Sequence, residues 1–283
     1  MSRLHCILIH GAWHGAATWS RLQPLLDAKG LHTHSLDLPG AGAKAASPES
    51  FFQRPLNPQA FATEVSPNAG VTQASRTQAV IDLIRRVRET GDKIMLVGHS
   101  LGGLTVSAVA EALNEPVDAL VYLAAFMLPP QMPALAMIQH DTMAGEEVAP
   151  CFLADPTVVG ALRLDPASDD PAYRRKLQSA FYGDLSDAEA NAHLAQLHCD
   201  EPAAVVVEPS PISPEGFGRQ PRYYIRCTQD RAIPLAGQNF MVDAVDTALG
   251  GQTQVYSLNS SHSPFYSQPE ALADMLTAIA LDL

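Results

Sequence analysis

The sequence predicts an α/β fold, a doubly wound and mostly parallel sheet that carries an inserted helical cap. Three observations predict it. Short apolar runs typical of strands alternate with segments of helical periodicity at both ends of the chain. Between these two parts, residues 129–220 contain helical fragments without a strand pattern. A serine flanked by glycines, Ser100, directly follows one of the apolar runs.

The first part of the chain alternates strand and helix before it reaches this serine. Apolar runs predict strands over 4–9 and 33–36, and apolar residues at helical spacing predict a helix over 18–28. Residues 41–74 are rich in Ala, Ser, Pro and Asn without a clear period, so we expect a long excursion there. A helix over 73–90, apolar on one face, leads into the strand before Ser100.

The last part of the chain continues this alternation. The elements predicted after Ser100 and outside the helical block are helices over 104–113, 238–249 and 269–281 and strands over 119–125, 222–227 and 254–258. The strand over 119–125 is uniformly apolar, as in parallel sheets buried on both faces.

The block between the two α/β parts is interpreted as a cap. Helical fragments are expected in it over 134–143, 156–164, 172–181 and 187–197. We therefore divide the chain into an α/β core, residues 1–128 and 221–283, and a cap inserted at 129–220. A chain of 283 residues is long enough for one domain of this kind with a substantial core.

Composition limits the classes of partner. The formal charge of −12 argues against a nucleic acid or an anionic membrane, because either would be repelled by such a surface.

The apolar run at the N-terminus is too short for a signal peptide, and no stretch reaches the roughly 20 apolar residues of a membrane helix. The four cysteines form no CxxC pair and are expected to be buried free thiols. We expect a cytoplasmic protein with a small-molecule substrate, and leave assembly into a homodimer open.

The residues around Ser100 have the pattern of a nucleophile elbow. Gly98, Ser100 and Gly102 stand in the order Gly-x-Ser-x-Gly between a predicted strand and a predicted helix. In such a turn the serine hydroxyl projects from the top of the sheet, and the glycines remove Cβ atoms that would clash. The pattern identifies Ser100 as a candidate nucleophile.

The candidate partners of Ser100 follow later strands. A serine hydroxyl is a poor nucleophile at neutral pH, so it needs a general base and a group that orients the base. Of the ten histidines, His262 follows the last predicted strand, where its loop can lie over Ser100. Asp230 follows the preceding strand and gives the chain order Ser, Asp, His. The alternative position for the acid, after the strand over 119–125, holds no carboxylate.

Two backbone amides are candidates for an oxyanion hole, the donors that stabilise negative charge on a reacting carbonyl oxygen. One is the N–H of Leu101, directly after the candidate nucleophile. The other is the N–H of Ala12, in a loop after the first strand where Gly11 permits a tight backbone path. The side chains of His10 and His14 are expected to hydrogen-bond the backbone of this loop.

With these residues placed, the chain resembles α/β-hydrolases of the branch that contains plant hydroxynitrile lyases and methylesterases, along with many bacterial esterases. The resemblance covers nearly the whole chain and implies the α/β-hydrolase fold. It rests on ordered motifs at residues 10–15, 98–103, 122–127, 227–234 and 261–263. The excursion at 41–74 departs from the plant members, which are shorter there.

The same resemblance separates two chemistries. Lyase members carry a threonine at the position of Gly11 and a lysine after the catalytic histidine, where this chain has Ser263. A cyanohydrin lyase needs a cation near the departing cyanide, and this loop supplies none. We expect a carboxylesterase that hydrolyses small to medium, partly apolar esters through an acyl-enzyme, without a cofactor or a metal. A hydroxynitrile lyase-type reaction on the same triad and a ligand receptor with a slow triad are the alternatives.

Overall fold

The computed structural model, which describes residues 3–89 and 91–283, has the predicted α/β architecture. A six-stranded sheet runs in the order β2-β1-β3-β4-β7-β8. Its strands are β1 (Leu4–Ile9), β2 (His32–Ser35), β3 (Lys93–His99), β4 (Ala119–Leu123), β7 (Arg222–Cys227) and β8 (Gln254–Leu258). Every pair of neighbours in this sheet is parallel. The strand order reverses at β1, so the carboxyl ends of β1 and β3 form the switch point where such sheets bind ligands.

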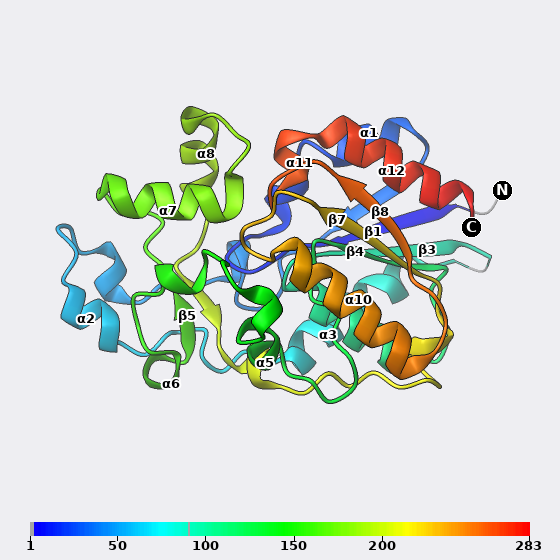
Figure 1. Ribbon diagram of the computed structural model, residues 1–283, viewed down its shortest axis with the longest axis horizontal. Helices are drawn as coiled ribbons and strands as arrows, with labels where there is room; N and C mark the ends of the chain where they lie inside the picture. The colour runs from blue at the N-terminus through cyan, green and yellow to red at the C-terminus, as the bar shows by residue number, and fades with distance from the viewer. Residues whose placement is uncertain (1–2, 90) are drawn as a thin grey trace.

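Helices cover both faces of the sheet (Figure 1). One side carries α1 (Gln23–Ala28), α11 (Pro264–Ser267) and α12 (Pro269–Leu281), and the other carries α3 (Gln73–Val87), α4 (Gly102–Ala112) and α10 (Leu235–Leu249). Side chains alternate between the two apolar clusters along β1: Cys6 and Leu8 belong to one, and Ile7 and Ile9 to the other. The central strands β1, β3 and β4 are therefore buried on both faces, as their continuous apolar runs predict, whereas the edge strands β2 and β8 are partly exposed.

Several predicted helices differ from the structure at their ends. The helix expected over 18–28 is a 3₁₀ turn over Ala16–Trp19 followed by α1. The helix expected over 73–90 is α3, which ends at Val87, and Thr90 lies outside the described residues.

Residues 129–220, which we call the cap segment, contain more than helices. Their main elements are α5 (Ala134–Ile138), α6 (Pro156–Val159), β5 (Ala161–Arg163), α7 (Pro171–Tyr182), α8 (Asp187–Leu194), β6 (Asp200–Pro202) and α9 (Ala204–Val207). The expectation of a purely helical segment is wrong at β5 and β6, which pair antiparallel. Gly160 ends α6 at φ 72°, so the helix expected over 156–164 stops there. The division into core and cap stays a prediction.

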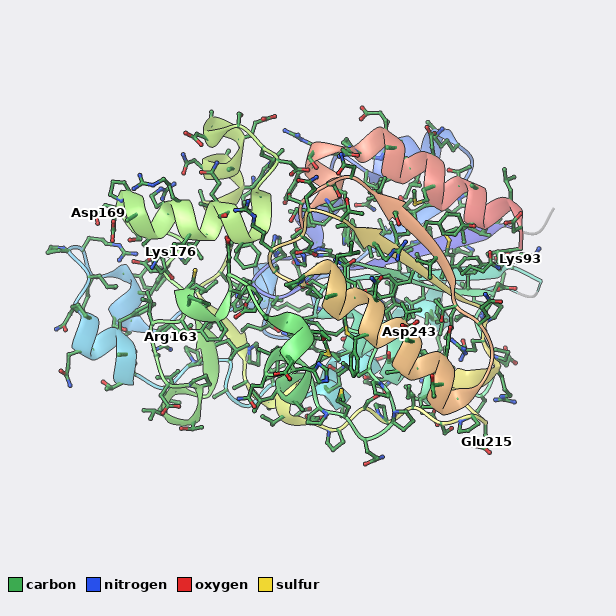
Figure 2. The ribbon with its side chains drawn as sticks, viewed as in Figure 1. Lys93, Arg163, Asp169, Lys176, Glu215 and Asp243 are labelled. Atoms are coloured by element: carbon green, nitrogen blue, oxygen red, sulfur yellow. The ribbon has the colours of Figure 1, made fainter. Side chains whose placement is uncertain are left out.

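The excursion at 41–74 packs on the cap segment. Its helix α2 (Pro58–Thr63) lies beside α6 and β5 (Figure 1). Arg163, labelled in Figure 2, lies on β5 and is fully buried. It forms an ion pair with Asp200 and donates to the carbonyl oxygens of Phe61 and Glu64 at 2.5 and 2.7 Å. A buried guanidinium thus joins the two regions.

The structure bears on the expectations for the cysteines and for membrane-spanning helices. All four cysteines are free and buried, as expected. Among the described residues, no helix has the length and apolar character needed to cross a membrane.

Candidate active site

Ser100 lies in a strained turn between β3 and α4. Its φ of 53° is in the left-handed region. This conformation costs a non-glycine residue free energy and persists only where the surrounding contacts hold it. The Ser100 N–H donates to the carbonyl of Leu123 at 3.3 Å, and the Ser100 carbonyl accepts from Phe126 N–H at 3.0 Å. A Cβ on Gly102 would lie 2.5 Å from the carbonyl oxygen of His10. The second glycine of the motif is thus required by the close approach of the β1 loop.

His262 and Asp230 form a buried hydrogen-bonded pair. The distance from His262 Nδ1 to Asp230 Oδ2 is 2.7 Å, and both side chains are almost completely buried. The other carboxylate oxygen accepts the backbone N–H groups of Ala232 and Ile233 at 2.7 and 2.9 Å. These two amides fix the carboxylate, so Nδ1 of His262 donates to it and Nε2 is left as the basic nitrogen.

The loop that carries His262 is attached to the elbow. His99, next to Ser100, donates through Nε2 to the carbonyl oxygen of His262 at 2.9 Å, and the two rings have centroids 4.5 Å apart. Burial, followed by the neighbouring His262, holds the pKa of His99 well below its usual range, so its ring is neutral. No hydrogen bond joins Ser100 Oγ to His262 in the part of the chain that the structure describes; such contacts often tighten only with substrate.

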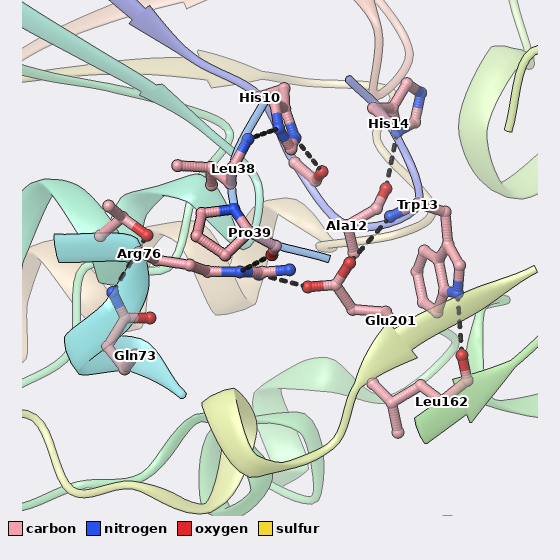
Figure 3. Close-up of polar contacts among 12 residues, drawn as sticks. His10, Ala12, Trp13, His14, Leu38, Pro39, Gln73, Arg76, Leu162 and Glu201 are labelled. Carbon is pink, nitrogen blue, oxygen red and sulfur yellow. Dashed lines mark hydrogen bonds and ion pairs between the residues drawn. The ribbon is translucent and has the colours of Figure 1, made fainter. Parts of the chain in front are cut away.

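The two residues whose amides are expected to form the oxyanion hole lie at the same pocket as Ser100. Ala12 and Leu101 both line it, and among the described residues neither N–H has an intramolecular acceptor. The predicted role of the loop histidines is confirmed (Figure 3): His10 Nδ1 donates to the Gly11 carbonyl at 2.8 Å, and His14 Nδ1 donates to the Ala12 carbonyl at 2.7 Å. The loop therefore presents an unpaired donor beside the candidate nucleophile.

The pocket over Ser100 is almost entirely apolar. Side chains from the core and from the cap segment line it, among them Trp13, Phe126, Met143, Phe152, Phe181, Val206 and Ile233. One carboxylate also lines it, that of Glu146, but its oxygens accept the N–H groups of Val148 and Ala149 at 2.8 to 3.3 Å. The site can therefore accommodate an uncharged, apolar group next to Ser100.

Two carboxylates of the cap segment that the sequence did not identify contact the loops of this site. Asp184 accepts the N–H of Ser261 at 3.0 Å, directly before His262, and also the Ser261 hydroxyl. Glu201 accepts the N–H of Trp13, directly after Ala12. Neither stands in a motif, and each lies far from its partner in the sequence, so no local signal could have found them.

Burial of the loop histidines predicts a loss of stability in mild acid. Burial lowers the pKa of His10 from 6.5 to about 4 and that of His14 to about 3, while the unfolded chain takes up these protons below about 6.5. The unfolded state then binds more protons, so the free energy of unfolding falls as pH drops below about 6.5. We expect a loss of about 2 kcal/mol for each of these histidines at about pH 5, measured by urea unfolding.

A variant assigns this pH dependence to a particular side chain. His10 Nε2 accepts the N–H of Leu38 at 3.1 Å, and the amide oxygen of His10→Gln can do the same without titrating. The variant should show a shallower decrease between about pH 6.5 and 4.5 than the wild type. Equal unfolding free energies of the wild type at both ends of this range would contradict the prediction.

Comparison with known proteins places the chain among hydrolases. A model of the Alpha/beta hydrolase family matches residues 6–275. Methylesterase 1 of Arabidopsis thaliana is 25% identical over 295 residues, which cover 98% of this chain and 95% of the relative. A pyrethroid hydrolase of Sphingobium wenxiniae is 29% identical over 280 residues, covering 97% and 86%. The crystal structure of a pyrethroid hydrolase from Sphingobium faniae shares the fold, with a TM-score of 0.73, 23% identity and coverage of 99% and 98%.

Proposed function

Because the chain belongs to the alpha/beta hydrolase family, we propose that it is a carboxylesterase that works through a Ser100, His262 and Asp230 triad. The observation that carries this proposal is the buried hydrogen bond between His262 and Asp230, on a loop attached to the strained elbow of Ser100. A base held in one tautomer beside a serine is the arrangement that acyl transfer requires. The names of the relatives, methylesterase and pyrethroid hydrolase, support hydrolysis.

The proposed reaction has two halves. His262 Nε2 takes the proton of the Ser100 hydroxyl as Oγ attacks the ester carbonyl, and the N–H groups of Ala12 and Leu101 stabilise the resulting oxyanion. The protonated imidazole then gives its proton to the departing alcohol, which leaves the acyl group on Ser100. A water, deprotonated by His262, attacks the acyl carbonyl. As the bond between the acyl group and Ser100 Oγ breaks, His262 returns the proton to Oγ and the acid is released. Asp230 orients the ring and stabilises its positive charge.

The pocket supports uncharged esters with an apolar acyl or alcohol group. Its only described carboxylate, Glu146, is turned to backbone amides, and aromatic and aliphatic side chains make up most of the remaining lining. An ester that carries an ionised group would place this charge in the pocket without a partner, which costs several kcal/mol. We therefore propose neutral esters of small to medium size as the substrate class.

The crowding at Gly11 favours hydrolysis over cyanohydrin cleavage. A Cβ at this position would lie 2.8 Å from Ser100 Cβ and 2.9 Å from His99 Nδ1, so the threonine of the lyase members would force the elbow or the loop to move. Ser263 also provides no cation for a departing cyanide. Release of cyanide from mandelonitrile that requires Ser100 would favour the lyase alternative.

A chain-length series of p-nitrophenyl acyl esters tests the proposed function. We expect turnover by the wild-type protein with a preference for apolar acyl groups that fit the pocket, and its loss in Ser100→Ala. Ligand binding without turnover across the whole series would instead support the receptor alternative. Exhaustive chelation should leave the turnover rate unchanged, because no step of the proposed reaction uses a metal.

The contacts of Gly11 also predict the effect of a single methyl group. Gly11→Ala should lower kcat by about 100-fold, because a displacement of the oxyanion loop of about 1 Å misaligns the Ala12 donor. Gly70→Ala is the matched control, since a Cβ at Gly70 meets nothing within 4 Å. Steady-state hydrolysis of a p-nitrophenyl ester measures both. Equal kcat values in the two variants would contradict the close packing at Gly11.

A further inference from the structure

The loop that carries Ala12 is held by a carboxylate from the cap segment. Glu201, on β6 and fully buried, accepts the N–H of Trp13 through Oε2 at 3.2 Å. Its Oε1 accepts Nη1 of Arg76, from α3, at 2.5 Å. Arg76 also donates through Nε to the carbonyl of Pro39 at 3.2 Å. Figure 3 shows this line of contacts, which runs from α3 through Glu201 to the oxyanion loop.

Trp13 requires such restraint because its backbone is strained. Its φ of 58° puts a bulky residue in the left-handed region, at a cost of roughly 1–3 kcal/mol. The indole N–H donates to the Leu162 carbonyl on β5 at 2.9 Å, and the ring packs against Phe152 and Phe181. These contacts hold the side chain. The Glu201 carboxylate is the acceptor that holds the backbone N–H itself.

The two peptide groups on either side of Ala12 are therefore both fixed by side chains. His10 donates to the Gly11 carbonyl, which orients the peptide that contains the Ala12 N–H. His14 donates to the Ala12 carbonyl, and Glu201 accepts the N–H of the same following peptide. If the peptide between Ala12 and Trp13 rotated, Ala12 would shift, and the N–H of Ala12 would turn away from the position of the oxyanion.

The ion pair makes a carboxylate tolerable beside a site that stabilises negative charge. An unpaired carboxylate at this position would repel the developing oxyanion, because a buried site screens charges weakly. The Glu201 side chain is inaccessible to solvent and that of Arg76 is 4% exposed, so the guanidinium neutralises the carboxylate at close range. Glu201 can then act through geometry, with little net charge from the pair.

We propose that Glu201 and Arg76 are positioning residues for the oxyanion hole. Glu201 holds the Ala12 amide in place through the Trp13 N–H, and Arg76 neutralises Glu201. This inference rests on the proposed function and deepens it, because it makes the cap segment a part of the catalytic scaffold as well as a wall of the pocket. Neither residue lines the pocket, and both act through Ala12.

Two double variants isolate the hydrogen-bond acceptor. Arg76→Met/Glu201→Gln removes both charges but keeps an oxygen for the Trp13 N–H, whereas Arg76→Met/Glu201→Leu removes the charges and the acceptor. We expect kcat of the Leu variant to be about 10- to 100-fold below that of the Gln variant, with a similar KM. The inhibition constant of a trifluoromethyl ketone, which adds to Ser100 as a tetrahedral oxyanion, should rise by the same factor.

The single variant Glu201→Gln, whose side chain has the same shape, tests the positioning role independently through its effect on kcat. Its one amide oxygen can serve either Arg76 or Trp13, so kcat should fall. Adding Arg76→Met frees that oxygen for Trp13 and should restore part of the loss. A purely structural role predicts no such rescue, because the second substitution would only remove further contacts.

A neighbouring ion pair provides the matched control. Arg163→Met/Asp200→Leu removes the buried ion pair between β5 and β6, whose two side chains do not contact the oxyanion loop. It should lower the urea midpoint and leave kcat unchanged. Equal kcat values and inhibition constants in the Gln and Leu double variants would overturn the positioning role, as would an equal loss of kcat in the control. A wild-type protein with neither ester turnover nor a ketone adduct would refute the proposed function and this inference together.

Discussion

Replacement of Ser100 by alanine is expected to lower kcat for ester hydrolysis by about 10⁵- to 10⁶-fold. Under the proposed mechanism, the variant loses the oxygen that forms the acyl-enzyme, while the pocket, the proposed oxyanion amides and the His262–Asp230 pair remain. The residual rate should come from binding and from the oxyanion hole alone. The measurement is kcat for the best p-nitrophenyl ester, with KM determined in parallel.

Ser107→Ala is the matched control for this substitution. Ser107 lies on α4, about two turns beyond Ser100, and its hydroxyl is hydrogen-bonded to Tyr122 at 2.8 Å, away from the pocket. We expect this variant to keep the wild-type kcat. A Ser100→Ala protein that is folded and retains a substantial part of the wild-type rate would show that another group is the nucleophile.

Asp230→Asn is expected to lower kcat by about 10⁴-fold while the fold is retained. The N–H groups of Ala232 and Ile233 both donate to one carboxylate oxygen, so the asparagine oxygen must take that position. Its NH₂ group then faces Nδ1 of His262, which has to accept a hydrogen bond and carry its proton on Nε2 instead. A ring in this tautomer cannot deprotonate Ser100.

The control for Asp230→Asn is the same substitution at a structural carboxylate. Asp246 accepts the N–H and the hydroxyl of Thr253 and pairs with Arg222, and it does not line the pocket. Asp246→Asn should change stability but leave kcat at the wild-type level. If Asp230→Asn were no more harmful to kcat than this control, the proposed tautomer control by Asp230 would be wrong.

The parts of the structure that the sequence predicted well are those with local signals. The apolar runs of β1, β7 and β8 need no information beyond their own residues, and the predicted strand bounds agree with the structure. The elbow requires glycine at position 102 for a steric reason, because a Cβ there would clash with the loop after β1. The position of a residue directly after a parallel strand brings it to one edge of the sheet, which is why Asp230 and His262 could be paired from the sequence.

The parts that the sequence did not predict depend on contacts between distant residues. β5 and β6 are short strands that pair only with each other, so neither has the length or the alternation of an ordinary strand. Glu201 contacts Trp13 across 188 residues of sequence, and Asp184 contacts Ser261 across 77. A carboxylate on the surface and a buried one that holds a loop look alike in a single sequence. Their difference arises only when the cap segment folds onto the sheet.

The most direct test of the triad is detection of the acyl-enzyme itself. The protein is mixed rapidly with a p-nitrophenyl ester, the released p-nitrophenolate is followed before steady state, and the quenched protein is digested and analysed by mass spectrometry. We predict a burst of about one equivalent per chain and an acyl group on the peptide that contains Ser100, both absent in Ser100→Ala. Rapid turnover with an acyl group on a different residue, or turnover that persists in Ser100→Ala, would contradict the account.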